Sequence, residues 1–216
     1  MARTLDLERR ADLATRAFEV IRARGVHRTT MSDLAAALGL KRPTLYFYFR
    51  DLGAVFEAVH EATQRAYLTH VTARLAGVAH PIDLLIAVLR STSEFHRAER
   101  ERIVALFQLW AVGGADADQV LARNREFTDP FRAQLIRAVA RGLETGAVAP
   151  CDPERIVDLT LAVLDGGLVQ HITRTAPTTA IIDEYVLRVL APLRRPRAAR
   201  PATRPRTRPR TPRSRP

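Results

Sequence analysis

The segment covering residues 30–49 contains two short helix-forming stretches separated by a tight turn, and this spacing most constrains the fold. Thr30 stands three residues before Asp33, a capping-box start with Asp in place of the usual Glu, and Gly39 ends the helix that follows. A second short helix opens on a Lys-Arg pair with Pro43 in its first turn, where proline is favoured. Two short helices in this arrangement predict a helix-turn-helix, whose second helix enters the major groove of DNA.

The second helix presents residue types suited to a DNA surface. It carries a cation, a hydroxyl and four aromatic side chains within eight residues, from Arg42 to Phe49. Leu45 and Phe49 lie four residues apart and supply the single apolar stripe that a half-buried helix needs, so Tyr46 and Tyr48 are expected at the surface. Exposed tyrosines beside cations suit phosphates and base edges. The alternative is a packing turn that happens to expose aromatic side chains.

The first 193 residues read as an all-α chain. Gly and Pro fall at intervals that punctuate helices, and no stretch keeps the alternating pattern of a strand. A first helix stops at Gly25, and Pro130 is expected to split or kink a long helix. The other expected helices cover about residues 30–38, 41–49, 51–75, 81–96, 99–112, 116–144, 153–173 and 178–193.

Charge is concentrated at the two ends of the chain. Residues 1–50 carry ten basic and five acidic groups, whereas residues 51–193 carry 14 and 18. The last 23 residues, Arg194 to Pro216, contain ten Arg, six Pro and no acid, which predicts a disordered tail with polyproline II character. This basic tail is either a low-complexity extension or a nonspecific DNA clamp, because polyanions are the natural partner of both basic ends.

Several classes of protein are disfavoured by the sequence. The longest apolar run, Leu84 to Leu89, is far shorter than the ~20 residues that cross a bilayer, and the start of the chain has no apolar signal region. We therefore expect a cytoplasmic protein with no membrane partner. The lone Cys151 has no nearby His to activate it, and no nucleotide, hydrolase or metalloprotease motif is present, so we expect no enzyme activity, cofactor or metal.

The N-terminal pattern resembles the DNA-binding domain of TetR-type transcriptional regulators over about residues 7–60. The matching residues are Ala17, Phe18, Gly25, Thr30, Met31, Leu34, Ala35, Leu38, Gly39, Leu40, Pro43, Thr44, Leu45, Tyr46 and Phe49. The resemblance implies an all-α homodimer with a helix-turn-helix domain at 1–51, a helical ligand-binding and dimerisation domain at 52–193, and the basic tail at 194–216.

The resemblance also implies the DNA contacts. Arg42, Pro43 and Thr44 would lie at the major groove, Tyr46 would touch a phosphate, and Tyr48 stands where the family often has a backbone-contacting His. Leu52 occupies the position of the family's usual phosphate-binding Lys, so Arg50 is expected to replace it. The complete set of expected DNA-contacting residues is Thr30, Lys41, Arg42, Pro43, Thr44, Tyr46, Tyr48 and Arg50.

The two C-terminal helices, at 153–173 and 178–193, are apolar on nearly every side. In a monomer they would expose a large apolar patch, which symmetric pairing into a four-helix interface would cover. The small residues of Asp165-Gly166-Gly167 would let helices approach, and the alternative is the core of a monomer. The expected interface residues are Ile156, Val163, Leu164, Leu168, Ile182, Val186 and Val189.

The middle of the chain supplies side chains for a ligand cavity. Pockets are mostly apolar with a few orienting polar groups, here His96, Gln108 and Arg137. Plain core packing is the alternative for each of them. The expected lining residues are Tyr67, Phe95, His96, Phe107, Gln108, Trp110, Phe131 and Arg137.

Together these features predict a ligand-responsive dimeric transcriptional regulator, and specifically a repressor. Its partners would be a palindromic duplex operator, a second copy of the chain and a small molecule, whose binding would swing the helix that begins near Leu52. One alternative is a ligand-independent, architectural DNA-binding protein that uses the basic tail. The other is a helical enzyme or adaptor with a vestigial helix-turn-helix.

Overall fold

The computed structural model describes residues 6–25, 28–112, 117–174 and 179–196, except for the side chains of residues 107–112, 117–124, 127 and 174. The basic tail beyond residue 196 lies outside the described residues. Within these ranges the regular secondary structure is helical, and extended pairing is limited to one isolated bridge between Val148 and Arg194, which confirms the all-α prediction. The helices are α1 (Leu7–Arg24), α2 (Met31–Ala37), α3 (Arg42–Tyr48), α4 (Leu52–Leu75), α5 (Pro81–Ala98), α6 (Arg100–Val112), α7 (Ala117–Glu144), α8 (Pro153–Arg174) and α9 (Thr179–Tyr185).

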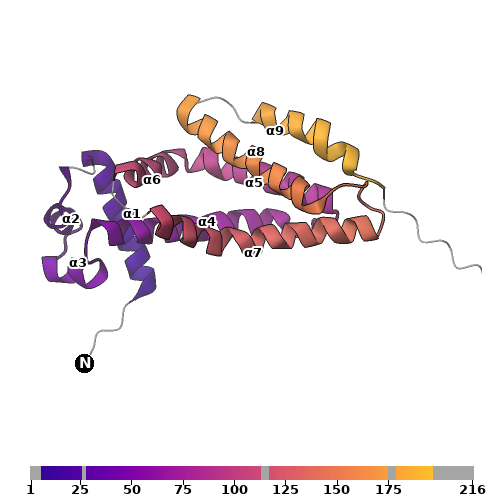
Figure 1. Cartoon of the computed structure of the whole chain (residues 1–216). Coiled ribbons are helices and arrows are strands. Elements are labelled where there is room, and N and C mark those ends of the chain that lie inside the picture. Colours follow the sequence, from indigo (N-terminus) through magenta and orange to yellow (C-terminus); the bar gives the residue numbers. More distant parts are fainter. Residues whose placement is uncertain (1–5, 26–27, 113–116, 175–178, 197–216) are drawn as a thin grey trace, which may run out of the picture.

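The helices form a small head and an elongated body (Figure 1). Helices α1 to α3 make up the head, and α4 runs from the head along the body, where α5, α7, α8 and α9 lie roughly along the same direction. One hydrophobic cluster joins α1, α2 and α3 to the first half of α4, as far as Val59, and a second joins α5, α7, α8 and α9. Because α4 packs in the first cluster and its last residue, Leu75, packs against the second, this helix connects head and body.

Side chains cap the starts of α1, α2 and α4, whereas α3 begins at Lys41 without a side-chain cap. The side chains of Asp6 and Asp51 accept backbone N–H bonds from Arg9 and Ala54, at 3.0 and 2.8 Å. At α2 the reciprocal capping box is formed by Thr30 and Asp33. Such caps satisfy backbone donors that the helix itself leaves unpaired, so these short polar residues fix where each helix begins.

Two helices differ from their predicted form. Helix α7 is continuous across Pro130, so of the two predicted effects, a split or a kink, the split is wrong. Pro130 is exposed, and water can satisfy the carbonyl that the missing N–H leaves unpaired. The C-terminal helix is not one α-helix: α9 passes into a π-helical turn, Val186–Leu190, and a 3₁₀ turn, Ala191–Leu193. Pro192 in that last turn has no N–H, so regular α-helical bonding cannot continue.

Helix α8 has an unusual combination of composition and burial. Its segment Pro153–Thr173 is, within the described part of the chain, the one helix long and apolar enough to cross a membrane, contrary to the expectation of none. A search for uninterrupted apolar runs does not find this helix, because single polar residues are spread along it. Only 28% of its most apolar window is buried by the rest of the chain. Such low burial of an apolar helix indicates a surface that another element covers.

Candidate nucleic-acid interface

The head holds α3 by one side only. Leu45 and Phe49 are fully buried in the first hydrophobic cluster, against Leu34 of α2 and Phe18 of α1, which are buried as well. This confirms the apolar stripe predicted from their spacing. The same cluster includes Val55 of α4, so the orientation of α3 depends on packing from three other helices. A rigidly supported short helix presents its outer side chains in a defined geometry.

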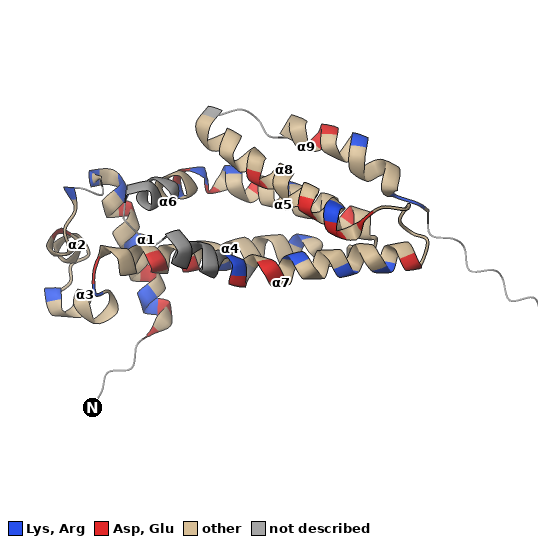
Figure 2. Ribbon diagram, in the orientation of Figure 1, with Lys and Arg blue, Asp and Glu red and all other residues tan. Residues whose placement is uncertain are grey.

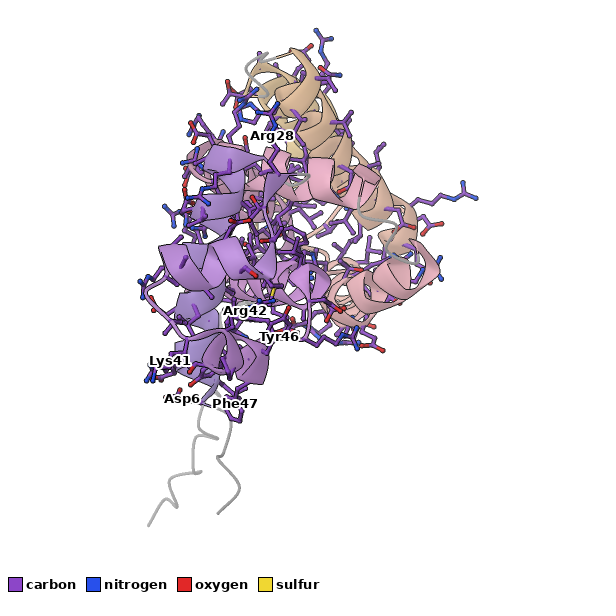
Figure 3. The ribbon with its side chains drawn as sticks, turned by 90° about the vertical axis from the view of Figure 1, so that its left-hand side faces the viewer. Asp6, Arg28, Lys41, Arg42, Tyr46 and Phe47 are labelled. Atoms are coloured by element: carbon purple, nitrogen blue, oxygen red, sulfur yellow. The ribbon has the colours of Figure 1, made fainter. Side chains whose placement is uncertain are left out.

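The outer side of α3 is exposed and free of acidic residues. Lys41, Arg42 and Pro43 are exposed, and the side chain of Thr44 is half-buried behind them. Tyr46 is 44% exposed, as predicted. Figure 3 looks at this end of the molecule and shows Arg42 and Tyr46 of α3 and Lys41 just before it, with Arg28 farther up the same end. Positive and hydroxyl-bearing groups on one protruding face suit a phosphate backbone and base edges.

The prediction that Tyr48 is exposed is wrong. Its side chain is 7% exposed and packs edge-on against Phe47, with ring centroids 5.1 Å apart, and against Phe49. The reason is helical spacing, because Leu45, Tyr48 and Phe49 stand at i, i+3 and i+4 and so share the inward side. Phe47, which the sequence did not single out as a surface residue, is 36% exposed instead.

Other cations and hydroxyls of the head have partners within the chain. The Thr30 hydroxyl donates to Asp33 at 2.5 Å, and hydrogen bonds from the Thr30 side chain and backbone lower the pKa of the Asp33 carboxyl. Arg50, in the position expected to replace the missing lysine, pairs with Asp51 at 3.2 Å while its side chain stays 80% exposed. Arg28, two residues before Thr30, is exposed at the same end of the molecule and was not named from the sequence; its place between two helices in a basic segment is the signal that could have pointed to it.

The body contacts the head through a second route besides α4. In α6, Ala105 and Leu106 pack against the first hydrophobic cluster. Nearby, Glu101 of α6 pairs with Arg22 in the last turn of α1, which also pairs with Glu19. A movement of α6 would therefore shift α1 through this ion pair.

The predicted dimer interface is corrected by the burial of its members. Ile156, Leu164 and Ile182 are 4–7% exposed and belong to the second hydrophobic cluster, so they are core residues of one chain. Val163, Val186 and Val189 are partly buried against the same cluster, and Leu168 is half-buried. The apolar side chains that remain outside are others, namely Leu159 (47% exposed), Val169 (52%), Ile181 (41%) and Leu187 (64%). The helical spacing of apolar residues could not distinguish the buried side of α8 from its exposed side, because both sides are apolar.

The exposed side of α8 carries an apolar stripe that includes one carboxylate, Asp165. Leu159, Ala162, Gly166 and Val169 are all exposed and follow the three- and four-residue spacing of one helix face. A Cβ added at Gly166 would meet nothing within 4 Å, so the surface there is open. On the adjacent α9, an open hollow of about 430 Å³ is lined by Ala180, Ile181, Glu184, Tyr185 and Arg188. We call the α8 stripe with Ile181 and Leu187 the outer apolar face.

Of the predicted ligand-lining residues, the structure buries some, exposes one and does not describe the side chains of others. Tyr67 bonds Thr92 through its hydroxyl at 3.0 Å and packs edge-on against Phe95, which is buried, and Phe131 packs partly buried against the second hydrophobic cluster. Arg137 is exposed on α7, so its assignment as an orienting group inside a pocket is wrong. It lies two residues from both Leu135 and Val139, which point inward. The side chains of Phe107, Gln108 and Trp110 lie outside the described residues.

His96 lines a small cavity of about 10 Å³ between α5, α8 and α9, which is room for about one water. Burial, and then the neighbouring His171, lower the pKa of His96 to about 4. His171 lines the same cavity, and its Nε2 atom is buried without a hydrogen-bond partner. Elsewhere, burial raises the pKa of the Cys151 thiol, with Asp152 adding to the effect, which disfavours a reactive thiolate.

Comparisons with known proteins agree with this geometry. Residues 13–59 match the model of the family described as bacterial regulatory proteins, tetR family. The chain is 26% identical over 170 residues, 78% of its length and 77% of the relative's, to nucleoid occlusion factor SlmA of Haemophilus influenzae strain PittGG. Among solved structures it is similar to a TetR transcription regulator from Haloarcula marismortui, with a TM-score of 0.72 at 13% identity over 87% of this chain and 100% of that one. It is also similar to AibR in complex with isovaleryl coenzyme A and operator DNA, with a TM-score of 0.57 at 20% identity over 82% and 96% of the two chains.

Proposed function

This chain belongs to the TetR family of bacterial regulatory proteins, and from that premise we propose that it binds operator DNA as a homodimer and releases it when a small molecule binds. The observation that carries the proposal is α3: a short helix fixed by Leu45, Tyr48 and Phe49, with an exposed outer side that bears cations and no carboxylate. The family consists of regulators and not of enzymes, and a protein of this kind works on the cytoplasmic chromosome.

The outer side of α3 divides into base-reading and phosphate-binding groups. Arg42 and Thr44 stand in the first turn, where they would reach base edges in the major groove with Pro43 beside them. Lys41 and Tyr46 flank them and would bind phosphates, together with Arg50. Thr30 can donate to a phosphate only if its hydroxyl breaks the hydrogen bond that it donates to Asp33. Tyr48 is left out of this set because it is buried.

Dimerisation would use the outer apolar face. Pairing Leu159, Gly166 and Val169 of α8 with the same residues of a second copy would cover the apolar surface that the chain leaves exposed. The open space beside Gly166 would let the two helices approach closely. A two-fold axis along this face would hold two heads on the same side, as successive major grooves about 34–36 Å apart require.

Ligand response would pass through α4 and α6. Both contact the cluster that supports α3, α4 through Val55 and α6 through Leu106. A molecule held between the helices of the body would bias their positions and so the separation of the two heads. The complex of the similar protein AibR with isovaleryl coenzyme A and operator DNA supports the binding of both a small molecule and DNA by this fold.

Selection of binding sites from a random duplex pool with the purified chain tests this function. A palindrome with half-sites about one helical turn apart is the expected result, because two symmetric heads must each contact a major groove. Enrichment of no sequence, or of a single unrepeated half-site, would contradict the proposal.

A ligand-independent regulator or nucleoid-binding protein is the second candidate. Two observations favour it: the identity to a relative named nucleoid occlusion factor, and the room for only about one water in the cavity beside His96. The two candidates differ in solution. Only the ligand-responsive regulator would lose its operator when a library of small metabolites is added.

A further inference from the structure

The outer side of α3 has an apolar centre that includes Phe47. An α-helix turns once in 3.6 residues, so each residue is rotated by about 100° from the one before it. Leu45, Tyr48 and Phe49, which are buried, therefore point to one side of this segment. Pro43 and Phe47, four residues apart and both exposed, point within about 30° of the opposite direction. The side of α3 that faces away from the head is therefore apolar along its middle.

The ring of Phe47 is exposed and is also held in position. Its side chain is 36% exposed, and the ring packs edge-on against the buried ring of Tyr48, with 5.1 Å between the centroids. Because an aromatic side chain has only two rotatable torsions, it offers a large contact area to a partner at a small cost in conformational entropy. Contact between apolar surface and water is unfavourable, so this ring is suited to an apolar group of a partner.

The residues around Phe47 indicate that the partner is DNA. Lys41 and Arg42 are exposed where the helix begins, and Tyr46 is 44% exposed beside Phe47. Figure 2 shows Lys and Arg at the start of α3 and in the segment between α1 and α2, and no acidic residue on α3. Figure 3 shows Phe47 at the same end of the molecule as Lys41 and Tyr46. An apolar protein surface would gain nothing from these cations, whereas a DNA duplex is a polyanion.

A duplex presents one apolar group in its major groove, the 5-methyl group of thymine. An apolar side chain such as Phe is suited to contact it, and the groove is wide enough to admit an α-helix. We propose that Phe47, with Pro43 beside it, contacts the 5-methyl group of one thymine in each half-site of the operator and so selects thymine at that position. This inference rests on the proposed DNA-binding function of α3.

Removing single methyl groups from the DNA tests the proposal without altering the protein. Each thymine of the duplex selected from the random pool is replaced in turn by deoxyuridine, which differs only by the missing 5-methyl group, and the dissociation constant is measured by fluorescence anisotropy. One thymine in each half-site should be sensitive, with a loss of affinity of about fourfold, as expected for one methyl-sized group returned to water. Replacing that T·A pair by C·G should also weaken binding, and 5-methylcytosine in the same place should recover about fourfold.

Variants of α3 then assign the sensitivity to one side chain. In Phe47→Ala the sensitive thymine and its deoxyuridine replacement should bind equally well, because the ring that covers the methyl group is gone. Tyr46→Phe is the matched control on the neighbouring residue. It should bind every duplex more weakly and keep the fourfold difference between thymine and deoxyuridine, because its lost hydroxyl contacts phosphate and not a base.

The outcomes separate this contact from the function of the head. Enrichment of no sequence from the random pool would overturn the proposed DNA-binding function and this inference with it. A selected half-site without a sensitive thymine, or a sensitivity that persists in Phe47→Ala, would overturn the inference alone. Equal affinity for the duplex and for one of its single strands would also overturn it, because Phe47 would then stack on unpaired bases instead.

Discussion

Arg22, in the last turn of α1, and Glu101, in the first turn of α6, form an ion pair that joins the DNA-binding head to the body. Both side chains are largely exposed, so the pair adds little to the stability of the fold. Its importance is positional, since α6 also packs on the cluster that supports α3. The contact therefore makes the orientation of the head depend on the position of α6.

Breaking this pair should change DNA binding more than stability. We expect Glu101→Arg to lower operator affinity roughly two- to tenfold, within the range of coupling effects, with little change in melting temperature. With Glu19→Gln present in every variant to remove the second partner of Arg22, the double variant Arg22→Glu, Glu101→Arg restores the attraction between α1 and α6 and should recover affinity. Titration of the selected duplex by fluorescence anisotropy measures both. A double variant as weak as the single one would argue against the pair as a connection.

Substitutions on the outer side of α3 should separate base from phosphate contacts. Arg42→Ala and Thr44→Ala should each cost about 1–3 kcal/mol in binding the selected duplex, and little with a scrambled one. Tyr46→Phe should weaken both duplexes alike, because a phosphate contact carries no sequence information. If Arg42→Ala and Thr44→Ala both bind the selected duplex at full strength, α3 is not the reading helix.

Two neighbouring aromatic residues should behave in opposite ways. Tyr48 is buried, so Tyr48→Ala should destabilise the fold by about 3–5 kcal/mol, as for other large aromatic truncations. Phe47 is partly exposed, so Phe47→Ala should cost much less. Urea unfolding of the two variants side by side measures the difference. Equal losses of stability would mean that the two rings share the same environment.

A charge on the outer apolar face should abolish dimerisation without unfolding the chain. Val169→Arg and Leu159→Arg place a cation on an exposed surface of the monomer, where it costs little, but would bury it unpaired between two copies. Sedimentation should then show a folded monomer. Leu164→Arg is the matched control on the inner side of the same helix, and it should unfold the chain instead. A Val169→Arg dimer would place the interface elsewhere.

Stability should depend on pH through His96. Because its folded pKa of about 4 lies below the usual 6.5, the unfolded chain takes up a proton first as the pH falls. Stability is therefore lost between about pH 6.5 and 4, by at most about 3 kcal/mol for this residue. In His96→Gln that part of the loss should disappear, which chemical unfolding at pH 7 and pH 4.5 would reveal. An unchanged pH dependence would indicate that His96 is accessible to water.

The order of the helices and the presence of a helix-turn-helix could be predicted from the sequence, because caps, stops and apolar stripes are local. Thr30, Asp51 and Gly39 act within a few residues of their position, so their effect does not depend on the rest of the fold. The burial of Leu45 and Phe49 could also be predicted locally, from their four-residue spacing. Packing in other helices does not change which face of a short helix is apolar.

The tertiary structure decided which of two apolar faces points inward. On α8 both Leu164 and Val169 are apolar, and only the position of α5 and α9 makes the first a core residue and the second a surface residue. Tyr48 shares the inward side of α3 with Leu45 through helical spacing, and the packing of α3 against α2 then covers that side. The position of Arg194 at the start of the basic tail could not be predicted from the sequence either, because its hydrogen bond to Asp83 joins residues 111 positions apart. Contacts of that kind depend on the packing of whole helices, which local sequence pattern does not contain.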